Sequence, residues 1–126
     1  MRRHAFVSIL ALLLIPQVQP SFAQTPEELS NQVTVRRTAY GVPHILADNE
    51  SAAGFGMGYV QAEDHCQTIM KLILTARGEL SANFGDVGGN VESDFWNKQY
   101  RIHARATETY GLLDADIRAM IEGYAM

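Results

Sequence analysis

Residues 54–85 read GFGMGYVQAEDHCQTIMKLILTARGELSANFG. Apolar residues recur in this stretch at alternating spacings of four and three, the period of an α-helix with about 3.6 residues per turn. The residues of this apolar stripe are Phe55, Tyr59, Ala62, Cys66, Ile69, Ile73, Ala76 and Leu80. We therefore predict one long helix over residues 55–84, with the stripe, Cys66 included, packed against a second layer of the protein.

Three glycines alternate where this helix begins, at Gly54, Gly56 and Gly58. Each costs about 1 kcal/mol relative to alanine in a helix interior. They indicate either that another backbone approaches too closely for any Cβ, or that the helix starts loosely. They follow no strand directly and lack the spacing of GxGxxG or of a P-loop, which argues against a phosphate site.

The first 23 residues have the features of a secretory signal peptide. Arg2 and Arg3 precede an apolar run, and Ser21-Phe22-Ala23 supplies the small residues of a cleavage site. The apolar run is short for a membrane span, so we expect cleavage after Ala23 rather than an anchor. The expected products are a signal peptide, residues 1–23, and an exported segment, residues 24–126, in the periplasm or the medium.

The exported segment is acidic. Two of the ten Lys and Arg residues lie in the signal, so residues 24–126 carry eight basic and 14 acidic side chains, a net charge of −6. This balance argues against nucleic acid or an anionic membrane as the main partner. The chain of 126 residues allows one domain at most.

Two short extended runs precede the long helix. Val33–Arg37 and Pro43–Ala47 flank the turn sequence Tyr40-Gly41-Val42, which predicts an antiparallel hairpin. The hairpin is followed by Asp48, Asn49 and Ser51, any of which can cap the start of the helix.

Two further helices are predicted beyond the glycine-rich residues 85–90. Residues 91–105 form the first of them, and Asp114 caps the second. On the last helix one face is apolar, with Ile117, Met120, Ile121 and Tyr124. No stop signal follows that face, so we expect the sequence to be a piece of a longer protein.

Reactive side chains are few and scattered. His44, His65 and His103 fall in different predicted elements, and Cys66 is the single cysteine, so we expect neither a metal site nor a cofactor site in these residues. In an exported protein, a lone cysteine is a buried free thiol, an intermolecular bridge, or half of a disulfide with sequence not shown here.

Glu63, Asp64 and His65 are consecutive. Consecutive positions of a helix point in different directions, so we interpret these three as a solvated face and not as an ion site. The same divergence separates His65 from Cys66 and argues against a catalytic Cys–His pair. From the residues alone, the sequence is an exported α+β fragment without a visible active site.

Three stretches resemble the penicillin acylase family. Residues 35–47, VRRTAYGVPHILA, resemble its opening, and residues 56–64, GMGYVQAED, resemble a G-x-GYxxAxD signature at the start of a long helix. Residues 75–79, TARGE, with Phe84-Gly85, are similar to the ARGE…FG that ends that helix. The cysteine after AED and the TARGE form are most similar to the branch of acyl-homoserine lactone acylases and aculeacin-type acylases.

The resemblance implies the N-terminal nucleophile hydrolase fold, four layers in the order αββα, of which residues 24–126 would be the N-terminal part of the α chain. Family members are exported inactive precursors that cut themselves into α and β chains. The nucleophile is the first residue of the β chain, usually serine, with its own α-amino group as base. The oxyanion hole lies mainly in the β chain.

The resemblance therefore assigns no catalytic, cofactor-binding or metal-binding residue to this sequence. It implies as partners the rest of the α chain, the β chain and a small N-acyl substrate, such as a β-lactam antibiotic or an acyl-homoserine lactone, with calcium possible in the full-length enzyme. It also implies that Cys66 is half of a disulfide within the α chain. Two alternatives are a small exported binding module without enzymatic activity, and a different hydrolase that uses Cys66.

Overall fold

The structure, a computed structural model, describes residues 24–126. It holds a two-stranded hairpin among helices, as predicted, and none of these helices is both long and apolar enough to cross a membrane. The predicted signal peptide, residues 1–23, lies outside the described residues. The elements are α1 (Pro26–Ser30), β1 (Val33–Arg37), β2 (Pro43–Ala47), α2 (Glu50–Arg77), α3 (Leu80–Phe84), α4 (Asn90–Gln99), α5 (Ile102–Thr109), η1 (Tyr110–Leu112) and α6 (Ala115–Tyr124).

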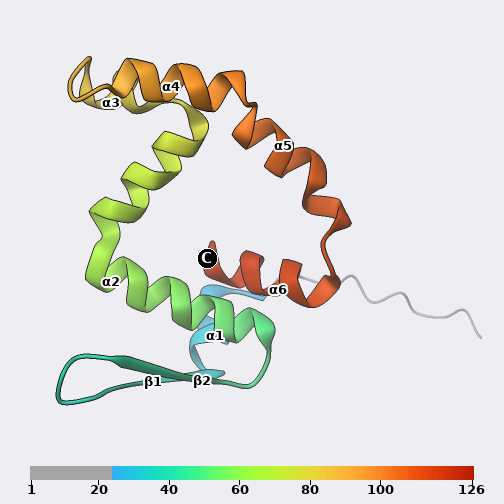
Figure 1. The fold of residues 1–126 in the computed structure, drawn as a ribbon. Coiled ribbons are helices and arrows are strands. Elements are labelled where there is room, and N and C mark those ends of the chain that lie inside the picture. Colours follow the sequence, from blue (N-terminus) through green and yellow to red (C-terminus); the bar gives the residue numbers. More distant parts are fainter. Residues whose placement is uncertain (1–23) are drawn as a thin grey trace, which may run out of the picture.

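The helices follow one another around an open ring (Figure 1). α2 forms two sides of this ring, α3 with α4 and then α5 form the next two, and α6 returns to pack against the first half of α2. The hairpin and α1 lie against that same half of α2. Most of the packing therefore lies at one end of α2.

The hairpin has the predicted boundaries. β1 and β2 pair antiparallel, with Val33 opposite Ala47 and Arg37 opposite Pro43. The turn between them is closed by hydrogen bonds from the Thr38 amide to the Val42 carbonyl, 3.0 Å, and from the Gly41 amide to the Thr38 carbonyl, 2.9 Å. Gly41 has φ +80°, the left-handed conformation that glycine adopts at no steric cost.

The long helix begins earlier and ends earlier than predicted. Asn49 caps its start, because its Oδ1 accepts a hydrogen bond from the Ala52 amide at 2.9 Å. The helix ends at Arg77, because Gly78 takes a left-handed φ of +67° and its amide bonds back to the Leu74 and Thr75 carbonyls. The prediction of one helix over residues 55–84 is therefore wrong beyond Arg77, where the separate helix α3 follows.

The helix predicted over residues 91–105 is also wrong as one element. α4 ends at Gln99 and α5 begins at Ile102, with Arg101 between them at a left-handed φ of +55°. Neither glycine nor proline marks this break. The last helix starts after Asp114, as predicted, but the Asp114 side chain makes no capping hydrogen bond.

Two of the three glycines, Gly54 and Gly58, receive another backbone, as one of the two interpretations predicted, whereas Gly56 receives side chains of the hairpin. A Cβ on Gly54 would overlap the Met120 carbonyl of α6, and one on Gly58 would lie 2.6 Å from the Tyr124 carbonyl oxygen. From the other side, a Cβ on Gly123 would overlap the Ser51 carbonyl. The alternative of a loose start is wrong, because the helix already begins at Glu50, before the first glycine.

The predicted apolar stripe is only partly covered. Its members Tyr59, Ala62, Cys66 and Ile73 are exposed, so the prediction that Cys66 is buried is wrong. On α6, Ile117, Met120 and Ile121 of the predicted face are likewise exposed. The buried apolar residues are Leu29, Ala52, Val60 and Leu80.

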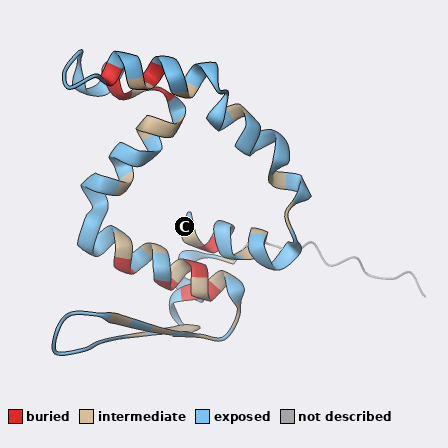
Figure 2. Cartoon of the chain, viewed as in Figure 1, coloured by how far each residue is buried: buried red, intermediate tan, exposed pale blue. Residues whose placement is uncertain are grey.

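The positions of these residues explain the discrepancy. Red, buried segments in Figure 2 gather on the first half of α2 and at the corner of α3 and α4. α6 packs where the side chains of α2 are smallest, and the stripe of large apolar residues runs along other faces. Helical periodicity identifies apolar positions but does not say which of them a neighbour covers.

Candidate functional site

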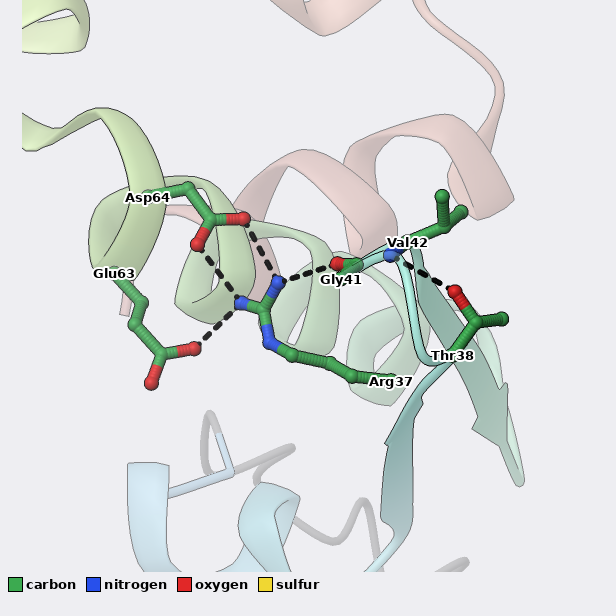
Figure 3. A network of polar contacts seen from close by, with 6 residues as sticks. All are labelled: Arg37, Thr38, Gly41, Val42, Glu63 and Asp64. Carbon is green, nitrogen blue, oxygen red and sulfur yellow. Dashed lines mark hydrogen bonds and ion pairs between the residues drawn. The ribbon is translucent and has the colours of Figure 1, made fainter.

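A network of polar side chains joins the end of the hairpin to the middle of α2 (Figure 3). Arg37 is the last residue of β1, and its Nη1 donates to the Gly41 carbonyl and to Asp64 Oδ2, both at 3.0 Å. Its Nη2 donates to Asp64 Oδ1 at 3.0 Å and to Glu63 Oε2 at 2.6 Å. We call Arg37, Glu63, Asp64 and the Gly41 carbonyl the Arg37 network.

The two carboxylates share one cation although they are neighbours in sequence. Consecutive helix positions point about 100° apart, but the guanidinium lies between the Glu63 and Asp64 side chains and reaches both. Glu63, Asp64 and His65 are exposed, as the interpretation of a solvated face predicted, but that interpretation missed the ion pairs that Glu63 and Asp64 form with Arg37. His65 remains exposed and outside the network.

The electrostatics of the network favour the fully charged state. The hydrogen bond to Asp64 first, and the one to Glu63 second, raise the pKa of Arg37 above its ordinary value. A guanidinium stays protonated in proteins, and it can hold two carboxylates in a fixed geometry. The Arg37 network therefore orients the hairpin on α2 and supplies no acid, base or nucleophile.

The turn that carries Gly41 is rigidly built. Thr38 Oγ1 accepts hydrogen bonds from the amides of Val42 at 3.2 Å and of Tyr40 at 3.3 Å. Arg37 binds the Gly41 carbonyl of the same turn. The Arg37 network is thus fixed at the hairpin end by the turn.

The other reactive side chains do not form a site. His44 lies on β2, and His103 lies on α5, far along the chain from His65 and Cys66. Within residues 24–126, no three His, Cys, Asp or Glu side chains lie close enough together to hold a metal ion. Cys66 is exposed, just beyond the point where α2 bends.

A second polar cluster fixes the corner between α3 and α4. The buried carboxylate of Asp94 accepts hydrogen bonds from the Leu80 amide at 2.9 Å, the Ser81 amide at 2.8 Å and Ser81 Oγ at 2.6 Å. Burial acts to raise the pKa of Asp94, but the hydrogen bonds from Ser81 and Leu80 outweigh it and lower the pKa below its ordinary value. This residue caps α3 from a neighbouring helix.

Sequence reasoning missed both polar clusters. Arg37 is separated from Glu63 and Asp64 by 26 and 27 residues, and Asp94 is 14 residues from Leu80. Neither separation produces a local period or a recognised spacing. The one available signal is that Arg37 and Asp64 each belong to a stretch on which the family resemblance rests.

Comparison with known proteins decides the family. Residues 32–126 match the family model described as penicillin amidase. The chain belongs to the penicillin amidase family. This confirms the resemblance that the three sequence stretches predicted.

Individual relatives agree with this assignment. Aculeacin-A acylase of Actinoplanes utahensis is 54% identical over 54 residues, which are 43% of this chain and 7% of that protein. Acyl-homoserine lactone acylase PvdQ of Pseudomonas fluorescens is 36% identical over 97 residues, which are 72% of this chain and 12% of the relative. The chain therefore spans only a small part of the length of these curated relatives.

A solved structure shows the same fold. Thermostable penicillin G acylase from Alcaligenes faecalis superposes with a TM-score of 0.66 at 29% identity, over 74% of this chain and 49% of that chain. This confirms the predicted fold class, an α+β fragment of the N-terminal nucleophile hydrolase fold. The matched proteins are named as acylases.

Proposed function

We propose that residues 24–126 are the N-terminal scaffold segment of an exported acylase that removes the acyl group from an N-acyl substrate. The observation that carries this proposal is the penicillin amidase match over residues 32–126, in a segment whose polar clusters only join its own elements. The relatives are named for acyl-homoserine lactones, aculeacin A and penicillin G, so an N-acyl compound such as an acyl-homoserine lactone or a β-lactam antibiotic is the proposed substrate class.

The exposed apolar surface supports a scaffold role. Leu72 is 62% exposed and Leu112 is 82% exposed, with Phe95, Trp96 and Tyr100 also at the surface. Stable proteins cover most side chains of this kind, because each buried one contributes about 1.5–3 kcal/mol. The proposed partners that cover them are the rest of the α chain and the β chain of the same precursor.

Two hollows beside α2 offer places for such packing. One, about 250 Å³, lies between α2 and the end of α6, and the other, about 170 Å³, lies between α2 and β1. Phe55 and Tyr59 line both of them. Apolar side chains from the rest of the enzyme would fill these hollows.

In the proposed enzyme the chemistry belongs to the β chain. Its N-terminal nucleophile attacks the amide carbonyl, the acyl group passes to the nucleophile as the amine leaves, and water then releases the acid. Residues 24–126 position the hairpin and the helices and supply no reacting group. Calcium remains an expectation for other parts of the full-length enzyme, and no step is assigned to it here.

A chimera tests the scaffold role. Residues of this chain would replace the segment of the Pseudomonas fluorescens PvdQ that they match, and hydrolysis of an acyl-homoserine lactone would be measured. We expect the chimera to retain activity, since the relative supplies the nucleophile. A chimera that folds and processes but has no activity would contradict the proposal.

The isolated chain supplies the complementary measurement. Incubated with an acyl-homoserine lactone or a phenylacetyl amide, it should release no amine above a heat-treated control. Release that disappears in Cys66→Ser would instead favour a different hydrolase. Export is tested by N-terminal sequencing of the periplasmic product, which should begin at Gln24.

A further inference from the structure

α2 bends sharply without any of the usual causes in its sequence. His65, in its middle, has φ −141° and ψ 28°, which lie outside the helical region. Sharp bends in helices normally occur at proline, at glycine or serine pairs, or where another group inserts. Residues 62–67 read AEDHCQ and contain none of these residue types. The cause of the bend must therefore be a contact made by the folded chain.

The Arg37 network lies directly at this bend. Glu63 and Asp64 are the two residues before His65, so they are the last residues of the first helical half. Negative side chains at the C-terminal end of a helix are unfavourable because they meet the negative end of the helix dipole. A cation at that position is favourable, and Arg37 supplies one to both carboxylates.

The hairpin fixes Arg37 relative to the first half of α2. A Cβ on Gly56 would lie 2.7 Å from Val33 Cγ2 and 2.9 Å from Ile45 Cγ2, so both strands contact this half closely. The Gly41 carbonyl holds the guanidinium from the turn. Arg37 therefore favours a helix end at Asp64, where His65 and Cys66 are also weak helix formers.

We propose that Arg37 holds a hinge in α2: its contacts with Glu63 and Asp64 stabilise the bend at His65, and without them α2 straightens into one continuous helix. Straightening would return the His65 backbone to the helical region and move α3, α4 and α5 relative to the hairpin. The rival cause of the bend is closure of the ring by α6, which packs on Gly54 and Gly58. This inference is independent of the proposed enzymatic function.

The bend can be measured in the full 126-residue chain by a distance between two spin labels. Glu50→Cys and Lys71→Cys, in a Cys66→Ser background, place labels on exposed positions in each half of α2. A continuous helix would separate these positions by about 32 Å along its axis, and the bent helix by less. The ¹³Cα chemical shift of His65 reports its backbone conformation independently.

Arg37→Ala is expected to lengthen the label distance toward the straight value and to move the His65 shift to its helical position. The matched control is Arg36→Ala, since Arg36 is an exposed neighbour on β1 whose side chain makes no hydrogen bond among the described residues. The control should leave both measurements unchanged. If Arg37→Ala keeps the bent values, ring closure by α6 sets the bend and the proposal is overturned.

Removing the contacts from the side of α2 keeps the test decisive if Arg37→Ala does not fold. Glu63→Gln combined with Asp64→Asn takes away both ion pairs and leaves Arg37 in place, so the label distance should lengthen as in Arg37→Ala. Retention of the bent values in this double variant would overturn the proposal.

Discussion

The two halves of α2 have similar apolar content but differ in how much of it is covered. The first half, up to Asp64, carries all the buried residues of the helix, namely Ala52, Gly54, Gly56 and Val60. Beyond His65 no residue of α2 is buried, and Leu72 is 62% exposed. Figure 2 shows this change along one helix.

Side-chain size explains the difference. Gly54 and Gly58 let the backbone of α6 approach closely, and Gly56 admits the side chains of β1 and β2. The second half carries Met70, Leu72 and Ile73 at its surface and contains no glycine. An apolar helix face thus becomes a core only where a neighbour in the same segment fits against it, and elsewhere it remains a surface for another partner.

The difference between the two halves of α2 requires that the glycine contacts stabilise the first half. Gly54→Ala should lower the free energy of unfolding by about 2–3 kcal/mol, measured by urea unfolding followed by circular dichroism. The physical reason is that the new Cβ overlaps the Met120 carbonyl, which is backbone and cannot rotate away. This is the largest effect that we expect.

The matched control for this substitution is Gly111→Ala. A Cβ at Gly111 meets no atom within 4 Å, and the residue does not need a positive φ. In the absence of a clash, alanine is neutral or slightly stabilising because it restricts the unfolded chain. Equal effects at Gly54 and Gly111 would show that helix propensity, and not the contact with α6, determines the change in the free energy of unfolding.

A buried leucine provides a second test of the difference between the two halves of α2. Leu29 of α1 is 1% exposed and packs at the first half of α2. Leu29→Ala should cost about 2 kcal/mol of unfolding free energy through lost burial and the cavity that remains. Leu72→Ala, on the exposed second half, should change it by less than about 0.5 kcal/mol. If the two leucines cost the same, the second half is covered in the isolated chain.

Local sequence signals predicted those elements that depend on local chemistry. The hairpin boundaries followed from alternation and from the turn at Gly41, and the glycines of α2 indicated the close approach of a backbone. Family membership followed from three motifs. Each of these features depends on a few adjacent residues.

Features that depend on distant residues could not be predicted in this way. The break at Arg101 has no glycine or proline, and the bend at His65 lies in a sequence with no usual cause of a kink. Cys66 fits the apolar period but faces solvent, because its side of α2 has no neighbour in this segment. Asp94 and Arg37 find their partners only once the chain has folded.

Loss of the Asn49 cap at the start of α2 is expected to change the free energy of unfolding by less. Asn49→Ala removes the hydrogen bond to the Ala52 amide, and with it the 2.6 Å bond that Asn49 Nδ2 donates to Gln32 Oε1. The unfolding free energy should fall by about 1 kcal/mol. Asp48→Ala is the control, because Asp48 precedes the cap and its side chain makes no such bond within residues 24–126. Equal losses would show that general polarity before the helix matters more than capping.

The smallest effect is expected at the corner of α3 and α4, and it depends on pH. The pKa of Asp94 is lowered in the folded chain from its usual 3.8, so the stabilisation by its ionised form is complete above about pH 3.8 and is lost as the pH falls through the lower, folded value. The amide signals of Leu80 and Ser81 should therefore shift on acidification below pH 3.8, whereas the Ala52 amide, capped by the non-titrating Asn49, should not shift through its own cap.

In Asp94→Asn the two corner amides should already be shifted at pH 7 and should lose this acid transition. Because only the short helix α3 depends on this carboxylate, the helical content of α2 should change little over the same range. An acid shift of Leu80 and Ser81 that persists in Asp94→Asn would assign the transition to another carboxylate and remove Asp94 as the cap of α3.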